Sequence, residues 1–193
     1  MIKMEYFIKK IVDILSKKGL EDKEISNIML TSNETLINEI ADVIFDFMNR
    51  GKKIIYNVQV DYSKNVEEMV EITMHEWANE DITSEHFLNI RGKSAEVSVE
   101  LIHFNRSILS DDALLEMSAM GYRAANMQEF LAFGAKYPDL QRKFPIVGLG
   151  SVWHSEDSHL VAYMSWGASG RYLHLWHLDL VWGDGCRFAA VKE

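Results

Sequence analysis

Apolar residues recur at helical spacing through the first 51 residues of the chain. One set spans residues 4–18, a shorter one begins at Asp22, and a third begins after Ser32 or Asn33, either of which can cap a helix, and stops at Gly51. Each set would place its apolar side chains on one face of a helix. The pattern predicts an N-terminal group of three helices that forms a bundle or a docking face.

The period changes to alternation after this helical region. Residues 53–62 and 94–104 alternate apolar and polar side chains and are rich in β-branched types, which predicts two half-buried strands. Residues 65–79 favour a helix with Trp77 on its inward face, and residues 111–120 favour a shorter helix. Helices and strands that are combined in this way indicate the α+β class.

Residues 89–93 separate the predicted helix from the second predicted strand, and there Gly92 interrupts a run of polar residues. We therefore expect a domain boundary at this point. Residues 1–92 would form an N-terminal, mostly helical region with one strand and one further helix, and residues 93–193 would form a separate α+β domain.

Residues 121–133, GYRAANMQEFLAF, carry a well-defined helix start. Asn126 is a good N-cap, and Glu129, three residues later, can complete a capping box. With Gly-Tyr-Arg at 121–123 and Phe130, this segment resembles the glycine-tyrosine-arginine-(x)-proline-threonine-x-x-glutamate-tryptophan motif of the formylglycine-generating, or sulfatase-modifying-factor, branch of the C-type lectin fold. Asn126 takes the place of the threonine and Phe130 that of the tryptophan.

Two later segments resemble further motifs of the same branch. Residues 148–153, GLGSVW, look like its Gly-Gly-Ser-Trp strand with one residue inserted, and residues 185–191, GCRFAAV, look like its closing Gly-Phe-Arg strand. The order and approximate spacing of the three motifs agree over residues 94–193. The resemblance implies that this region is a C-type-lectin-like α+β domain that follows the N-terminal helical region.

The departures from this pattern bear on the chemistry. Ala125 replaces the usual proline, and Cys186 is the only cysteine, whereas the oxidase members hold copper with a pair of cysteines. A calcium-binding lectin would carry a Glu-Pro-Asn or Gln-Pro-Asp loop before Trp-Asn-Asp. Only the Trp-Gly-Asp at residues 182–184 resembles this arrangement, and no proline follows Pro145. We therefore expect no metal, no cofactor and no formylglycine-generating activity.

One branch of this fold has neither chemistry. The variable proteins of diversity-generating retroelements carry a C-type lectin domain at the end of the chain and use its last strands and loops to bind ligands. The resemblance implies that residues 154–184 form such a surface here, and its residue types are ones enriched in binding surfaces. The expected ligand-binding residues are Tyr163, Ser165, Trp166, Tyr172, His174, Trp176, His177, Asp179 and Asp184.

The segment RYLHLWHLDL at residues 171–180 predicts how several of these side chains point. The leucines change from odd to even positions, so we expect the register to flip at a turn or bulge between Trp176 and His177. The side chains opposite the leucines would then be Tyr172, His174, His177 and Asp179. A two-histidine, one-carboxylate metal site is not expected, because a metal pair on a strand would be two positions apart, whereas His174 and His177 are three apart and share a face only if the bulge corrects their positions.

The remaining aromatic residues and the cysteine divide between core and surface. We expect Trp153 and Trp182 to fill the core, and Trp166 and Trp176 to lie at the surface. Cys186 falls where the family strand has phenylalanine, which predicts a small buried apolar residue rather than a nucleophile.

Charge and composition restrict the partners. The formal net charge is −9, and no cluster of Lys and Arg is present that would bind a phosphate backbone. No apolar run approaches about 18 residues, and charged residues interrupt the first apolar segment, so we expect neither a spanning helix nor a secretory signal. With a single cysteine, these features predict a cytoplasmic protein. The expected partners are a protein or small-molecule ligand at the C-terminal surface and, at the N-terminal helices, a cellular partner or another copy of the chain. Neither nucleic acid nor membrane is expected.

Two other functions remain open. The chain could be an enzyme derived from the formylglycine-generating branch with altered chemistry, which would need a convergent polar pocket. It could also be a structural or regulatory interaction module. Joint exposure of residues 171–184 favours binding, burial around a cavity with Arg171 or Arg187 favours an enzyme, and burial without a cavity favours the module.

Overall fold

The computed structural model describes residues 54–193 together with residues 16, 21 and 23. Apart from those three positions, the helices expected before Gly51 lie outside the described residues. The chain divides into two compact units, Met1–Lys52 and Lys53–Glu193. The boundary expected between residues 92 and 93 therefore falls inside the second unit, and the division lies after Lys52.

Residues 54–92 belong to the second unit because they pair and pack with its later elements. β1 (Ile55–Val60) pairs antiparallel with β3 (Ala95–Ile102). The buried face of α4 (Val66–Thr73) lies in the same core as α6 (Met127–Lys136). Such short elements bury an apolar side only against a partner. The polar residues around Gly92 thus form a loop within a domain.

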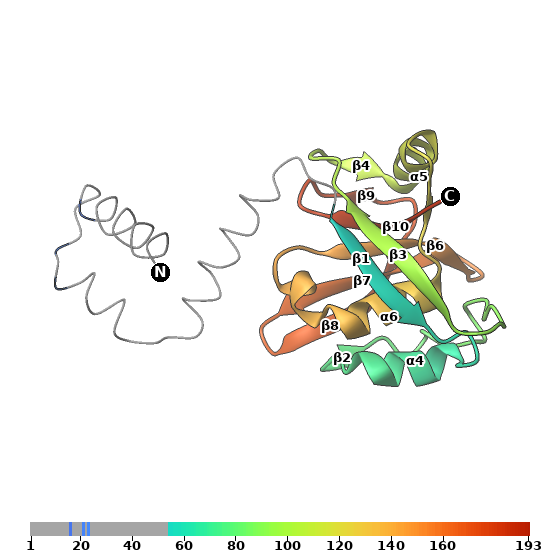
Figure 1. Cartoon of the computed structure of the whole chain (residues 1–193). Helices are drawn as coiled ribbons and strands as arrows, with labels where there is room; N and C mark the ends of the chain where they lie inside the picture. The colour runs from blue at the N-terminus through green and yellow to red at the C-terminus, as the bar shows by residue number, and fades with distance from the viewer. Residues whose placement is uncertain (1–15, 17–20, 22, 24–53) are drawn as a thin grey trace. The chain divides into compact units, whose positions relative to one another are not determined.

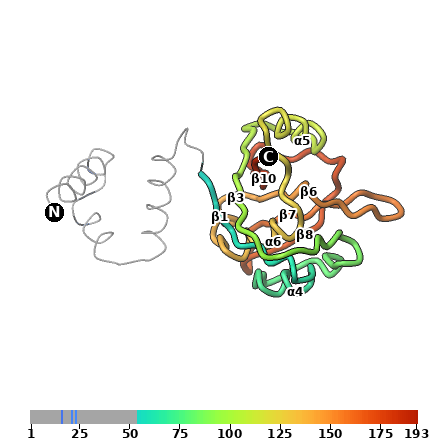
Figure 2. Tube along the Cα trace, turned by 45° about the vertical axis from the view of Figure 1, so that its right-hand side comes forward, coloured from blue at the N-terminus to red at the C-terminus, as the bar shows by residue number. Residues whose placement is uncertain are grey.

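A mixed sheet of eight strands forms the centre of this unit, with the order β1-β3-β10-β6-β7-β8-β2 (Figure 1). Its other strands are β10 (Arg187–Lys192), β6 (Ile146–His154), β7 (His159–Gly167), β8 (Gly170–His177), β2 (Trp77–Ala78) and β5 (Tyr122–Ala124), which pairs with β10. The last strand of the chain therefore lies in the middle of the sheet, between β3 and β6 (Figure 2). β4 (Ile108–Leu109) and β9 (Val181–Trp182) form a separate two-stranded sheet.

The sheet has a core on each face. One core contains Phe130 and Phe133 of α6 together with Leu173 of β8. The other contains Met117 of α5 (Ser110–Ala119) and Trp182 of β9. Figure 1 shows α4 next to β2 at one end of the unit and α5 next to β4 and β9 at the other. This arrangement confirms the predicted α+β class for the described residues, and no helix among them has the length and apolar character needed to cross a membrane.

Both predicted strands and the short helix are present, as β1, β3 and α5. The helix expected over residues 65–79 is too long, because α4 ends at Thr73. Met74 adopts a left-handed conformation with φ of 52°, which terminates the helix. The chain then continues as β2, where Trp77 is exposed rather than inward, contrary to the prediction.

The predicted capping box at the start of α6 is confirmed. The side chain of Asn126 accepts a hydrogen bond from the backbone N–H of Glu129, and the carboxylate of Glu129 accepts one from the backbone N–H of Asn126. α6 then packs tightly on the sheet. A Cβ at Gly148 of β6 would lie 2.9 Å from the ring of Phe130, so this close approach requires glycine.

Candidate functional site

The hairpin of β7 and β8 presents a row of aromatic side chains on one face of the sheet. In its register, Tyr163 lies opposite His174 and Ser165 lies opposite Tyr172. Trp176 continues the same face, because side chains two positions apart on a strand point the same way. The other face of the hairpin carries apolar residues such as Leu173 and packs into the core with α6.

β2 adds a residue to this row that the sequence did not indicate. β2 pairs in parallel with β8, and Trp77 lies opposite Tyr172. Trp77 therefore joins the same face, since residues in register on neighbouring strands share a face. We define the aromatic surface by these residues: Trp77, Tyr163, Ser165, Tyr172, His174 and Trp176.

His174 lies at the centre of the aromatic surface. Its ring stacks on Tyr163 with centroids 4.7 Å apart and lies 5.2 Å from the ring of Trp77 and 5.5 Å from that of Tyr172. Its Nε2 is 3.2 Å from the hydroxyl oxygen of Ser165. Burial lowers the pKa of His174, which favours a neutral ring at neutral pH.

The two tryptophans at the ends of the row are open to solvent. Trp77 is 46% exposed and Trp176 is 43% exposed, whereas the rings between them are half-buried. Tyr163 rests edge-on against Trp182, which is only 5% exposed and belongs to the core. The outer rings thus sit on a layer that is itself packed, which restricts their motion.

The turn of the hairpin positions Tyr172. Its ring lies over Gly167, where a Cβ would approach the ring to 2.1 Å, so a larger residue would displace it. The hydroxyl groups of Ser169 and Tyr172 are hydrogen-bonded to each other. Both contacts hold a ring that would otherwise be free to rotate.

The structure places four of the expected ligand-binding residues away from this surface, namely His177, Asp179, Asp184 and Trp166. β8 continues without a flip to His177, which lies opposite Leu160 and therefore on the other face from His174. The predicted change of register between Trp176 and His177 is wrong. The turn instead follows His177, and Asp179 is exposed within it, while Asp184 is exposed in the loop before β10.

Trp166 also points to the other face of the hairpin, because it lies opposite Arg171. It is exposed, as the sequence predicted, and the guanidinium of Arg142 in the short helix η1 (Pro138–Arg142) lies 4.6 Å from its ring centroid. Trp166 is therefore occupied by a contact within the protein. It forms no part of the aromatic surface.

The remaining predicted core residues differ in their burial. Trp182 is buried, which confirms the prediction. Trp153 is half-buried and stacks on His86 with ring centroids 3.9 Å apart. Cys186 is half-buried next to the second core, and burial raises the pKa of its thiol. Within the described residues no three His, Cys, Asp or Glu side chains are grouped so as to hold a metal ion.

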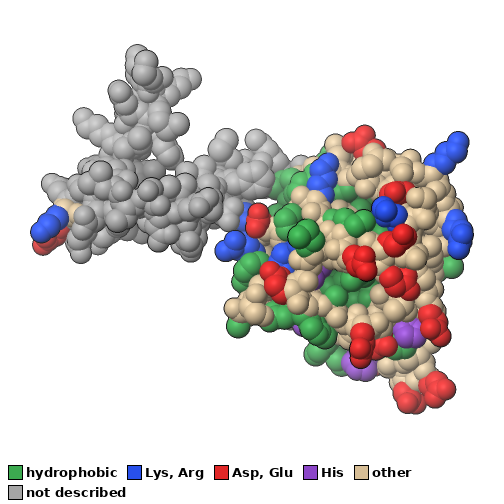
Figure 3. All heavy atoms as spheres, turned by 90° about the horizontal axis from the view of Figure 1, so that it is seen from below, with side chains coloured by type: hydrophobic (Ala, Val, Ile, Leu, Met, Phe, Trp, Pro, Cys, Tyr) green, Lys and Arg blue, Asp and Glu red, His purple; other side chains and the backbone are tan. Residues whose placement is uncertain are grey.

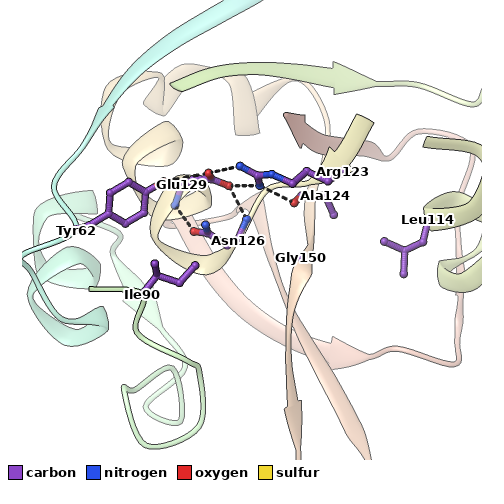
Figure 4. Close-up of a pocket in the computed structure, with 8 residues that line it drawn as sticks. All are labelled: Tyr62, Ile90, Leu114, Arg123, Ala124, Asn126, Glu129 and Gly150. Carbon is purple, nitrogen blue, oxygen red and sulfur yellow. Dashed lines mark hydrogen bonds and ion pairs between the residues drawn. The ribbon is translucent and has the colours of Figure 1, made fainter. Parts of the chain in front are cut away.

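A separate depression of about 580 Å³ lies at the start of α6 (Figure 4). Its polar floor is the carboxylate of Glu129, which accepts two hydrogen bonds from Arg123, at 2.8 and 2.7 Å, and one from the hydroxyl of Tyr62, at 3.0 Å. Leu114 and Ile90 supply apolar walls. Burial and the charge of Glu129 raise the pKa of Tyr62. The polar groups of this depression are therefore used to hold the protein together.

Arg171 lies beneath the hairpin on the face opposite the aromatic surface. It is 9% exposed, and its guanidinium donates to the carbonyl of Thr73, to the carbonyl of Gly134 at 2.8 Å and to Oε1 of Gln141 at 3.1 Å. These acceptors come from α4, α6 and η1. Arg171 therefore joins three helices and does not line a cavity with the aromatic residues.

His75 contacts the same network and predicts a dependence of stability on pH. Burial, followed by the nearby charge of Arg171, lowers its pKa from 6.5 to about 4. Since the folded protein binds the proton less well than the unfolded chain, stability is highest above pH 6.5 and falls as the pH drops toward 4. Because the ring is partly exposed, we expect a loss of about 1 kcal/mol between about pH 7.5 and about pH 5.

Urea unfolding at the two pH values measures this effect. His75→Gln is the matched variant, since its amide stays neutral and can still donate to Gln141. Its free energy of unfolding should vary less with pH than that of the unchanged protein. Equal pH dependence in both proteins would show that His75 is not the group responsible.

The three segments that carry the family resemblance lie next to one another in the structure. β10 pairs with β5 through Ala190 and Ala124 and with β6 through Phe188 and Val147. These contacts join residues 121–124, 146–154 and 187–192, which are far apart in sequence. Comparison with protein-family models, with curated proteins and with solved structures finds no match for this chain.

Proposed function

We propose that this chain is a non-catalytic binding protein that uses the aromatic surface to bind a protein ligand. The observation that carries the proposal is the exposure of Trp77 and Trp176 at the two ends of a packed row of rings. Water contact with large apolar rings costs free energy that a bound partner would recover. Tryptophan and tyrosine are also the residues that most often dominate binding energy in protein interfaces.

The rigidity of the surface supports the same proposal. Aromatic side chains have few rotatable bonds, so little conformational entropy is lost when a partner binds. Here Tyr172 is held by Gly167 and Ser169, and Tyr163 rests on Trp182. A surface that is already ordered pays less of the entropic cost of association.

We further propose that the unit Lys53–Glu193, in which residues 94–193 carry the resemblance, is a C-type-lectin-like domain of the kind found in variable proteins of diversity-generating retroelements. The adjacency of its three motif segments supports this proposal. In that family the last strands and loops bind ligands, and β7, β8 and the turn after β8 lie within residues 154–184, which the resemblance assigns to that surface. The proposed setting is the cytoplasm, with self-association through the N-terminal helices and no contact with nucleic acid.

An enzyme derived from the formylglycine-generating branch is the alternative that we favour less. It would require a pocket with polar groups free to act on a substrate. In the depression at α6, Arg123 and Tyr62 both bond Glu129. A purely structural module is also less favoured, because Trp77 and Trp176 contact the solvent.

Alanine substitutions of the exposed tryptophans should remove binding with little effect on folding. Trp77→Ala and Trp176→Ala should each lower the free energy of unfolding by about 1–2 kcal/mol, because about half of each ring is already exposed. Trp182→Ala, the buried control, should cost about 3–5 kcal/mol. Urea unfolding measures all three variants.

The binding test uses a phage-displayed random peptide library that is panned against the full-length protein. Selected peptides are then tested against the folded double variant Trp77→Ala/Trp176→Ala. Peptides that bind the unchanged protein and lose most of their affinity for the double variant support the proposal. Peptides that bind both proteins equally, or a failure to select any peptide, would overturn it.

A further inference from the structure

The edge of the sheet at β8 is only partly covered by another strand. β2 pairs with β8 through Tyr172 and Leu173, and the last backbone hydrogen bond between the two segments runs from the N–H of Asn79 to the carbonyl of Leu173. The chain then turns away, because the carbonyl of Asn79 accepts a hydrogen bond from the N–H of Ile82. Within the part of the chain that the structure describes, the segment from His174 to His177 therefore has no strand on its outer side.

The register with β7 determines which backbone groups of β8 face this open edge. The N–H of Leu178 donates to the carbonyl of His159, so the neighbouring residues His177 and Leu160 form a non-hydrogen-bonded pair. Such pairs recur at every second residue of an antiparallel ladder. The N–H and C=O groups of Leu175, two residues earlier, therefore point away from β7 and toward the open edge.

Three backbone groups on the open edge have no partner among residues 54–193. They are the N–H and the C=O of Leu175 and the N–H of His177, whereas the carbonyl of His177 accepts a hydrogen bond from the N–H of Leu180. Unpaired backbone groups on an edge strand form a template for a further strand. The segment from His174 to His177 also contains no Lys, no Pro and no bulge, which are the features that usually protect such an edge.

The exposed tryptophans lie along the same edge. Trp77 pairs with Tyr172 through its backbone, yet its ring is closer to that of His174, at 5.2 Å, than to that of Tyr172, at 6.4 Å. The ring of Trp77 thus leans along β8 in the direction of Leu175, and Trp176 follows Leu175 in the chain. Figure 3, which views the end of the unit where α4 and β2 lie, shows hydrophobic side chains at the surface. The open edge therefore runs beside the two rings that carry the proposed function.

A strand added at this edge would bring a side chain to the aromatic surface. Residues in register on neighbouring strands share a face, so the ligand residue opposite Trp176 would point the same way as the indole. Directly opposite side chains have Cβ atoms about 4.5–5.5 Å apart, and aromatic or β-branched residues pair favourably at that distance. The ligand residues opposite Leu175 and His177 would make the backbone hydrogen bonds and point their side chains to the other face.

A second copy of the chain fits this edge less well than a peptide segment. If the register of β2 with β8 is continued, Asn79 lies beside His174. β8 of a second copy would extend beyond the open segment in both directions, and one of its ends would meet Asn79 and the residues that follow it. A short extended segment can end or turn away at that point. The geometry therefore favours a segment of a different polypeptide over edge-to-edge pairing of two copies.

Resting on the proposed function, we infer that the ligand of the aromatic surface is an extended segment of a partner polypeptide that adds a strand to β8 at Leu175 and His177. Antiparallel pairing lets one ligand residue bond both the N–H and the C=O of Leu175. The backbone hydrogen bonds set the register, and an aromatic or β-branched ligand residue opposite Trp176 supplies the apolar contact.

Amide hydrogen exchange of the isotope-labelled, full-length protein, followed by NMR, tests whether the edge is open. In the free protein, the N–H groups of Leu175 and His177 should exchange at least about tenfold faster than those of His174 and Trp176, which bond to β7. A peptide selected by the panning described above, added at about ten times its Kd, should slow exchange at Leu175 and His177 by about tenfold. His174 and Trp176 are the internal controls, because their N–H groups already have partners.

A scan of N-methyl groups along the same peptide tests strand pairing. An N-methyl group removes one backbone donor, so methylation at either of two positions separated by one residue should weaken binding by about three- to tenfold. Methylation of the position between them should have little effect, because its N–H points away from β8. Alanine in place of that middle residue should weaken binding instead, because its side chain lies beside Trp176.

A proline substitution tests the same edge from the side of the protein. His177→Pro removes one of the free donors without breaking a hydrogen bond to β7. It should bind the peptide about three- to tenfold more weakly than His177→Ala, the matched variant that keeps the N–H. Slow exchange at His174 and Trp176 reports that the proline variant is folded. If it does not fold, the exchange and methylation measurements decide.

Each outcome decides the inference. Exchange at Leu175 that is as slow as at His174 in the free protein, or that slows with protein concentration in the absence of peptide, would overturn it. If library peptides require Trp77 and Trp176 but neither protect Leu175 nor show the alternating effect of methylation, strand addition is wrong and the proposed function stands. If no peptide requires the tryptophans, both proposals fail together.

Discussion

Arg123→Ala is expected to lower the free energy of unfolding by about 2–4 kcal/mol. Glu129 is 1% exposed, and its carboxylate depends on Arg123 for two of its hydrogen bonds. Without the guanidinium, the buried carboxylate of Glu129 loses two hydrogen-bond donors. The same carboxylate accepts the hydrogen bond from the backbone N–H of Asn126 in the capping box of α6. Arg123 itself is 41% exposed, which keeps the expected loss below that of a fully buried pair.

The matched control is Arg106→Ala, which breaks the exposed ion pair with Glu116. That variant should lose less than about 1 kcal/mol, because solvent screens both groups. Urea unfolding of the two variants gives the comparison. A second variant, Arg123→Ala combined with Glu129→Gln, should recover part of the loss because it removes the unpaired charge. Equal losses in Arg123→Ala and Arg106→Ala would contradict this account.

Arg171→Ala should be at least as destabilising, with an expected loss of about 3–5 kcal/mol. The substitution removes donors from the carbonyls of Thr73 and Gly134 and from Gln141, all in the interior of the unit. Thr73 and Gly134 lie near the C-terminal ends of α4 and α6, where the helix dipole favours a cation. Arg171 therefore stabilises the contact of three helices with the end of the hairpin.

Two variants separate this role from a simple loss of charge. Arg171→Lys keeps the charge but presents a single ammonium group, so it should recover less than half of the stability. Arg142→Ala removes an exposed arginine of η1 and should cost less than about 1 kcal/mol. Thermal and urea unfolding report the order of the three variants. If Arg171→Lys were as stable as the unchanged protein, the several hydrogen bonds of the guanidinium would not be the cause of the stabilisation.

Local sequence patterns were sufficient for several elements. The alternation in residues 53–62 and 94–104 predicted β1 and β3, because burying one face of a strand requires a period of two. Asn126 and Glu129 predicted the start of α6, because a capping box is formed by residues three apart. These patterns involve residues that are close together in the sequence. They can be recognised without knowing which distant segment packs against them. For Tyr163, Tyr172, His174 and Trp176 the sequence also indicated residue types that are common in binding surfaces.

Only the tertiary structure decided where Trp77 lies. Its spacing continues the apolar face of the preceding helix, so a local pattern predicts an inward position. Instead the backbone N–H of Glu76 bonds the carbonyl of Arg171, and that of Asn79 bonds the carbonyl of Leu173. These bonds attach the segment to the edge of β8 and turn Trp77 to the aromatic face. β8, the strand that pairs with this segment, is almost a hundred residues away in the sequence. A local sequence pattern therefore could not reveal the pairing.

The same distinction explains the domain boundary and the position of His177. Polar residues do surround Gly92, but the pairing of β1 with β3 places this segment inside the unit Lys53–Glu193. The leucine pattern suggested a flip before His177, whereas the register with β7 carries β8 through that residue and the turn follows it. The sequence by itself determined β1, β3, α5 and the start of α6, but not the strand β2, and it showed which residue types are available for binding. Long-range backbone pairing decided which of those side chains share a surface, because register is fixed by hydrogen bonds between segments that are distant in the chain.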